Sequence, residues 1–138
     1  MQILDGKVMS AQVEAELKER VDAMLKKGQT PGLEVILVGD DPASHLYVGN
    51  KEKACARLGL YSKTVRLPED TTQEALEQAI REANEDPKIH GLLVQMPLPK
   101  HLDSDRALAL IAPDKDADGF QNASMGKLLR GEKGPVAC

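Results

Sequence analysis

The sequence predicts an α/β fold of three layers, in which helices cover both faces of a mostly parallel sheet. Two features indicate this fold. Three short apolar segments alternate with stretches of helical periodicity, in the order strand, helix, strand, helix, strand. These segments are apolar enough that both faces of the sheet should be buried, as parallel sheets require. At 138 residues the chain has the size of one domain with one core.

The first predicted helix runs from Asp5 to Lys27. Its apolar residues recur every few positions, which is typical of one face of an amphipathic helix, and Gly28 should end it. The segment LEVILV, Leu33 to Val38, is short, rich in β-branched residues and followed by Gly39. It therefore predicts a buried strand.

A second helix should run from Pro42 to Leu58. Proline suits the first turn of a helix, Asp41 suits the capping position before it, and Gly59 suits the end. The segment Leu60 to Leu67 alternates enough to predict the second strand. The chain thus returns to the sheet after one helix.

A third helix should begin after Thr71 or Thr72, either of which can cap it, and run to about Asn84. The segment Ile89 to Gln95 is nearly continuously apolar and predicts the third strand. With it the alternation of strands and helices is complete.

The segment after the third strand, Met96-Pro97-Leu98-Pro99, cannot continue a central strand because proline has no N–H to donate. It should form a loop at the carboxyl end of that strand. A further helix is expected from His101 to Ile111, then a turn-rich loop from Pro113 to Phe120. The tail from Gly131 to Cys138 has no clear periodicity.

Composition excludes several functional classes. Eighteen Lys and Arg face 22 Asp and Glu, for a net charge of -4, and the charges are mixed along the chain, so nucleic acid is a poor partner. No segment is apolar enough to cross a membrane and the amino terminus lacks a signal-peptide pattern, so we expect a cytoplasmic protein. Cys55 and Cys138 are too few for a disulfide framework and lack zinc-site spacing, so no metal is expected.

In open α/β sheets ligands bind at the carboxyl ends of the strands, which directs attention to the turns after Val38 and Val94. Ser44, Tyr47 and Lys51 follow the first turn at spacings of three and four, so they should share one helix face. A lysine held near apolar groups and a ring can exchange protons near neutral pH. The alternative is that Lys51 is a solvated surface lysine and Tyr47 a packing residue.

Gln95 ends an otherwise apolar strand, and its amide must find hydrogen-bond partners there. It is either a ligand contact or a cap on neighbouring backbone groups. Asp114, Asp116 and Asp118 alternate in PDKDADGF, but the glycine and the missing glutamate do not fit a calcium loop. Their simplest interpretation is that they are solvated turn acids.

The sequence contains none of GxGxxG, GxxxxGK[ST], HExxH or GxSxG. However, three segments in order closely resemble the signatures of the methylenetetrahydrofolate dehydrogenase/methenyltetrahydrofolate cyclohydrolase family. They are VGDDPASHLYVGNKEKA (Val38 to Ala54), GLLVQMPLP (Gly91 to Pro99) and PDKDADGF (Pro113 to Phe120). The resemblance covers nearly all of the chain.

The resemblance implies that residues 1–138 are a folate-binding catalytic domain, the amino-terminal half of a two-domain enzyme. Its tail, from about Gly131, would lead toward an NADP-binding Rossmann domain that the sequence lacks. The chain should therefore not bind NADP. A homodimer is implied for the intact enzyme but is doubtful for this chain.

The resemblance also implies residue roles. Lys51 would act as acid and base when the methenyl bridge opens, and Gln95 would position it. Tyr47 would stack on the folate ring system, and Asp118 would hydrogen-bond the pterin. The further pocket residues implied are Ser44, which would assist Lys51, and Val94, Met96 and Pro97.

Enzymes of this kind oxidise 5,10-methylenetetrahydrofolate with NADP and then hydrolyse the methenyl product to 10-formyltetrahydrofolate. Residues of this chain could support only the hydrolysis. Two alternatives are an inactive folate-binding fragment and a general α/β nucleotide-binding or interaction domain. The absence of every phosphate-loop motif disfavours the last.

Overall fold

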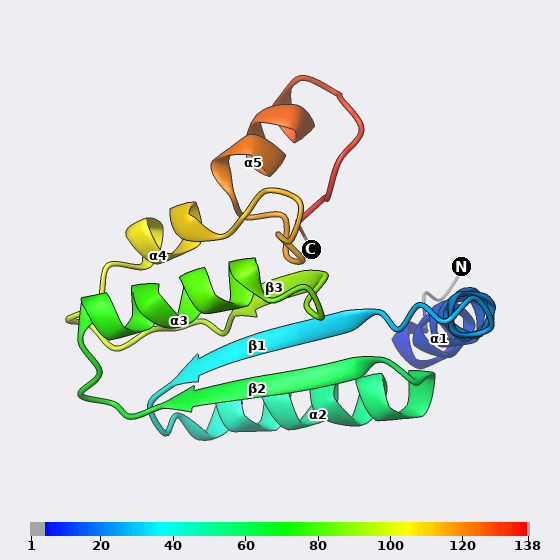
Figure 1. Ribbon diagram of the computed structural model, residues 1–138, viewed down its shortest axis with the longest axis horizontal. Coiled ribbons are helices and arrows are strands. Elements are labelled where there is room, and N and C mark those ends of the chain that lie inside the picture. Colours follow the sequence, from blue (N-terminus) through cyan, green and yellow to red (C-terminus); the bar gives the residue numbers. More distant parts are fainter. Residues whose placement is uncertain (1–4, 138) are drawn as a thin grey trace.

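The computed structural model describes residues 5–137, so Cys138 lies outside the described residues. Its strands form one parallel sheet in the order β2-β1-β3, with β1 in the centre (Figure 1). The elements are α1 (Gly6–Leu25), β1 (Gly32–Val38), α2 (Pro42–Leu58), β2 (Tyr61–Leu67), α3 (Gln73–Glu85), β3 (Gly91–Val94), α4 (Ser104–Leu110) and α5 (Asn122–Leu129).

Helices cover both faces of the sheet, so the prediction of a three-layer α/β fold is confirmed. Alternate side chains of β1 point to opposite faces, as they must in a strand. Ile36 and Val38 pack in the core that α3 and α4 complete. Val35 and Leu37 pack on the other face with Val48 of α2. The register sets Gly32 opposite Tyr61 and Leu33 opposite Gly91.

Local capping explains where the helices begin and end. The Asp41 side chain accepts a hydrogen bond from the Ser44 N–H at 2.7 Å and starts α2 at Pro42, as predicted. Gly59 ends α2 in the left-handed conformation, with φ at 87°, which glycine adopts without steric cost. Thr72 is the cap of α3, whereas Thr71 is buried and donates to the Pro68 carbonyl.

The amphipathic face predicted for α1 does not join the core. Only Val21 of this helix is buried, while Val8, Met9 and Val13 are exposed. The Arg57 side chain donates to Glu14 at 2.6 Å, which ties α1 to α2 at the surface. Among the residues that the structure describes, no helix is long and apolar enough to cross a bilayer.

Two predicted elements are shorter than expected. β3 spans only Gly91–Val94, because Ile89 lies in a turn closed by its N–H and the Asp86 carbonyl. The helix predicted from His101 begins at Ser104 instead, since Asp103 caps it and the His101 ring bonds the Thr71 carbonyl. α5, whose cap is Gln121, was not predicted from the sequence.

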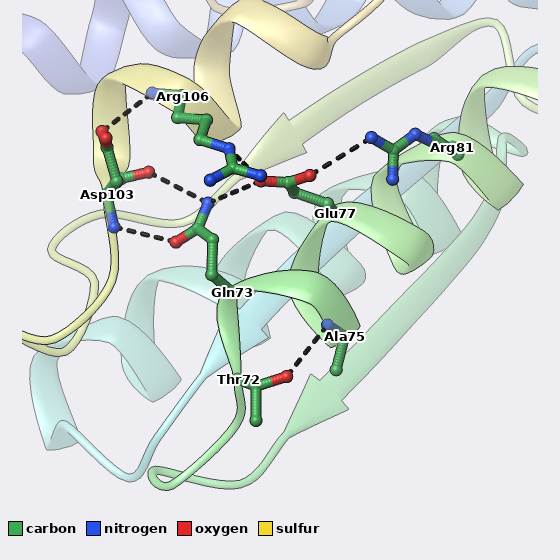
Figure 2. A network of polar contacts seen from close by, with 7 residues as sticks. All are labelled: Thr72, Gln73, Ala75, Glu77, Arg81, Asp103 and Arg106. Carbon is green, nitrogen blue, oxygen red and sulfur yellow. Dashed lines mark hydrogen bonds and ion pairs between the residues drawn. The ribbon is translucent and has the colours of Figure 1, made fainter.

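Polar contacts hold α4 against α3 (Figure 2). The Gln73 amide pairs with both backbone groups of Asp103, accepting from its N–H at 2.9 Å and donating to its carbonyl at 3.4 Å. The buried Glu77 carboxylate forms ion pairs with the Arg106 guanidinium at 2.5 Å and with the Arg81 guanidinium at 3.2 Å. These contacts fix the far end of the loop that follows β3.

Candidate functional site

Lys51 and Gln95 meet on the side of the sheet covered by α2. The Lys51 Nζ donates a hydrogen bond to the Gln95 Oε1 at 2.9 Å. The Gln95 Nε2 donates to the Met96 carbonyl at 2.8 Å, and the Gln95 N–H donates to the Ile36 carbonyl at 2.8 Å. The amide is therefore held on both sides, and its oxygen is aimed at the amine.

Gln95 reaches this side because of strand alternation. Leu93 faces α2, Val94 faces α3, and the next side chain returns to α2. α2 presents Lys51 there because Asp41 fixes where the helix begins. Two segments far apart in the sequence thus form one polar pair.

Asp118 lies close enough to Lys51 for the two charges to interact. Partial burial raises the pKa of the Asp118 carboxyl above its ordinary value. The Lys51 ammonium opposes this shift, whereas the neighbouring Asp116 carboxylate adds to it. An amine, an amide and a carboxyl group with an altered pKa therefore gather at one place, which is typical of functional sites.

The three alternating acids differ in environment. Asp114 is exposed, so it is the solvated turn acid that the sequence suggested. Asp116 is buried, with 5% of its surface exposed, so that interpretation is wrong for it. The signal for its role was the glycine three positions later, since Asp side chains commonly bond the backbone of such turns.

Tyr47 and Ser44, one and two turns before Lys51, lie differently. The Tyr47 side chain is 60% exposed, so its ring is free to receive a flat ligand. Ser44 is 2% exposed and pairs with Asp41. Hydrogen bonds from the backbone and side chain of Ser44 lower the pKa of Asp41. The structure thus places Ser44 in the helix cap.

The expected pocket residues after β3 do not share one environment. The Val94 side chain is 2% exposed and belongs to the core beneath α3, so it does not line the Lys51 side. Met96 packs partly against the same core. Pro97, which follows Met96 through a cis peptide bond, is exposed on the loop.

A hollow of about 700 Å³ lies at the other end of the strands, and Met24, Tyr61 and Pro87 are among the residues that line it. Its His90 ring is already engaged, because Nδ1 accepts from the Gly32 N–H at 3.1 Å. Among the described residues no group of three His, Cys, Asp or Glu could hold a metal ion. Lys51, Gln95 and Asp118 therefore remain the candidate site.

Residues 4–118 match the family described as tetrahydrofolate dehydrogenase/cyclohydrolase, catalytic domain. The chain is 52% identical over 137 residues to the bifunctional protein FolD of Moorella thermoacetica, which covers 99% of the chain and 49% of that protein. It is 48% identical over 137 residues to bifunctional protein FolD of Methanosarcina barkeri, covering 99% of the chain and 48% of that protein. The chain spans about half the length of the curated relatives it matches.

Solved structures agree. The chain superimposes on the bifunctional FolD methylenetetrahydrofolate dehydrogenase/cyclohydrolase of Campylobacter jejuni with a TM-score of 0.97 at 44% identity, covering 100% of this chain and 49% of that one. A Trypanosoma brucei methylenetetrahydrofolate dehydrogenase-cyclohydrolase, solved with NADP and an inhibitor, gives a TM-score of 0.94 at 38% identity. It covers 99% of this chain and 48% of that one.

Proposed function

Because this chain belongs to the tetrahydrofolate dehydrogenase/cyclohydrolase family through its catalytic domain, we propose that it binds one-carbon derivatives of tetrahydrofolate and carries the residues that hydrolyse the methenyl form. The observation that carries the proposal is the hydrogen bond from Lys51 to Gln95, with the Asp118 carboxyl near enough to interact with the Lys51 charge. A flat ligand with hydrogen-bonding edges suits this set of groups. Tyr47 offers it an exposed ring.

In the proposed hydrolysis, water adds to the bridging carbon of 5,10-methenyltetrahydrofolate. The Lys51 amine accepts a proton from the adding water as the new C–O bond forms. The resulting ammonium returns a proton to N5 as the bond between the bridging carbon and N5 breaks, and the hydroxyl proton is released to solvent. The formyl group remains on N10. One water is consumed and one proton is released overall, so Lys51 serves as base and then as acid.

The other side chains would bind and orient. Gln95 holds the Lys51 amine in place, because its own amide is fixed by the Met96 carbonyl. The Asp118 carboxylate would accept hydrogen bonds from the aminopyrimidine edge of the pterin, and Tyr47 would stack on the ring system. Met96 and Pro97 would border the ligand. Ser44 would act indirectly, through the cap that places α2.

For a protein of its relatives' full length we propose the activity named for them, oxidation of 5,10-methylenetetrahydrofolate with NADP as well as hydrolysis. NADP would supply the hydride acceptor. The turn after β1 does not fit the pyrophosphate of NADP. The Glu69 carboxylate occupies the space beside Gly39, and the two acids Asp40 and Asp41 follow, so the turn would repel an anion. No step assigned to this chain therefore involves NADP.

A cytoplasmic location and, for a protein of the relatives' full length, a homodimer are part of the same proposal and rest on the family. Binding without turnover is the second candidate function. The exposed Tyr47 favours it, because stacking of the ligand on an accessible ring does not require an acid–base group. Binding and hydrolysis must therefore be measured separately.

Calorimetric titration with 5,10-methenyltetrahydrofolate tests whether the chain binds folate as proposed. The chain should bind stoichiometrically, and Tyr47→Ala should weaken the affinity by about tenfold or more, as loss of stacking on a flat ring does. Tyr61→Ala is the matched control, because Tyr61 is also 40% exposed but lies at the other end of the strands. Absence of binding, or an equal loss in both variants, would contradict the proposal.

A further inference from the structure

Asp116 is a buried carboxylate that accepts hydrogen bonds from the backbone of its own loop. Its Oδ1 accepts from the Gly119 N–H at 3.0 Å and from the Phe120 N–H at 3.2 Å, and its Oδ2 accepts from the Gln121 N–H at 2.9 Å. Only 5% of its surface is exposed. Three amides thus converge on one side chain and close the turn from Asp116 to Gln121.

The stem of this turn is anchored independently. The Lys115 Nζ donates to the carbonyls of Ala83, Asn84 and Asp86 at 3.1, 2.7 and 2.9 Å, which satisfies the carboxyl end of α3. The Lys115 carbonyl accepts from the N–H of Leu92, a residue of β3, at 2.7 Å. The loop therefore enters the turn from a fixed position.

In the sequence, Asp118 lies between Asp116 and the residues whose amides Asp116 binds, so it is part of the closed turn. The turn reverses at Gly119, whose φ of 73° suits glycine. The direction of the Asp118 side chain is thus determined by bonds that the Asp116 carboxylate makes. We propose that Asp116 is the positioning residue that holds Asp118 beside Lys51, and that folate binding depends on it. This inference rests on the proposed function only for the identity of the ligand.

Electrostatics gives Asp116 a second effect on the same group. The charged groups that act on Asp118 are Lys51, from α2, and Asp116, from its own loop. Burial raises the pKa of Asp118, Lys51 lowers it, and the Asp116 charge raises it again. Removing the Asp116 charge should therefore lower the pKa of Asp118, a response that a remote structural residue would not produce.

The test compares Asp116→Asn with Asp114→Asn. Both remove one negative charge from the same loop, but Asp114 is exposed. Three quantities are measured: hydrogen exchange of the amides of Gly119, Phe120 and Gln121, the NMR titration of the Asp118 carboxyl, and the affinity for 5,10-methenyltetrahydrofolate.

Asp116→Asn should speed exchange at those three amides, lower the pKa of Asp118 and weaken the affinity by about tenfold or more, since an amide oxygen cannot accept all three bonds and its NH₂ faces a donor. Asp114→Asn should leave exchange at the three amides and the affinity within about twofold of the unmodified chain, as is usual for exposed positions. Unchanged exchange and affinity in Asp116→Asn would overturn the inference.

Gly119→Ala provides a second variant that keeps both carboxylates, in case Asp116→Asn does not fold. A Cβ at this position would lie 3.0 Å from the Ala137 nitrogen and strain the positive φ, so the turn must shift. Affinity should fall, and unchanged affinity would overturn the inference. If the unmodified chain binds no folate, the proposed function fails, while exchange and the Asp118 titration still decide the role of Asp116.

Discussion

The Lys51 amine donates a 2.9 Å hydrogen bond to the Gln95 side-chain oxygen, although 44 positions separate the two residues in the sequence. The bond joins α2, which follows the central strand, to the loop that follows β3. It therefore depends on the packing of both elements on β1. The amide oxygen accepts from the amine and carries no charge, so Lys51 is oriented without being paired to a carboxylate at that point.

Replacing Gln95 by Leu removes this acceptor while keeping a side chain of similar size. We expect methenyl hydrolysis to fall by about tenfold or more, because a misplaced acid–base group loses much of its contribution to the rate. Folate affinity should change less. Gln78→Leu, at an exposed position of α3, is the control. Parallel rate and affinity measurements check the prediction, and equal rates for the two variants would refute it.

Asp118→Asn should have opposite effects on stability and on folate binding. A carboxyl group whose folded pKa is raised above its ordinary 3.8 favours folding below that pH, and this contribution is lost as the pH rises through the folded pKa. At pH 7 the ionised group therefore opposes folding. The variant should melt at a higher temperature at pH 7 and bind folate more weakly. Calorimetric melting between pH 3 and 7 tests this, and a lower melting temperature at pH 7 would contradict it.

Glu77 should stabilise the fold with the opposite pH dependence. Burial disfavours its charge, but the Gln73 hydrogen bond and the Arg106 and Arg81 guanidinium groups outweigh that cost and lower its pKa below 4.5. Its contribution is thus present above pH 4.5 and is lost as the pH falls through the folded pKa. Urea unfolding should show Glu77→Gln to be less stable at pH 7, with the difference shrinking in acid.

The control for Glu77 is Glu82→Gln, an exposed position on the same helix. It should unfold at nearly the same urea concentration as the unmodified chain, since exposed charges contribute little to stability. A stability difference for Glu77→Gln that does not vary with pH would show that the ion pairs of Figure 2 do not stabilise the packing of α4 on α3.

Gly49 and Gly59 should respond oppositely to alanine. A Cβ at Gly49, inside α2, meets nothing within 4 Å, so Gly49→Ala should stabilise the fold by about 0.5–1 kcal/mol. Gly59 has a φ of 87° and a Cβ there would lie 3.3 Å from Leu25, so Gly59→Ala should destabilise by roughly 1 kcal/mol or more. Unfolding by urea measures both, and a shift of the same sign in the two variants would refute the argument.

The parts of the fold that follow from local chemistry could be predicted from the sequence. Asp41 and Gly59 bracket α2 as expected, because a capping carboxylate and a left-handed glycine act within a few residues. α5 was missed because its cap is a glutamine and Gly126 interrupts its interior. Neither residue type signals a helix.

The candidate site could be predicted only where it depends on local spacing. Spacing could place Lys51 on one helix face, but residue type could not distinguish the exposed Asp114 from the buried Asp116, because their difference arises from tertiary packing. Strand alternation, in contrast, could have excluded Val94. If Gln95 faces α2, the preceding side chain must face α3.

The central claim is that Lys51 transfers protons during hydrolysis of 5,10-methenyltetrahydrofolate. Stopped-flow measurement of methenyl loss, with the chain and its Lys51→Arg variant, tests it most directly. Arginine keeps the positive charge but stays protonated, so the variant should be slower by about a hundredfold or more. Lys53→Arg, at an exposed position of α2, should match the unmodified chain. Near-equal rates for Lys51→Arg and the unmodified chain, or no hydrolysis by either, would contradict the account.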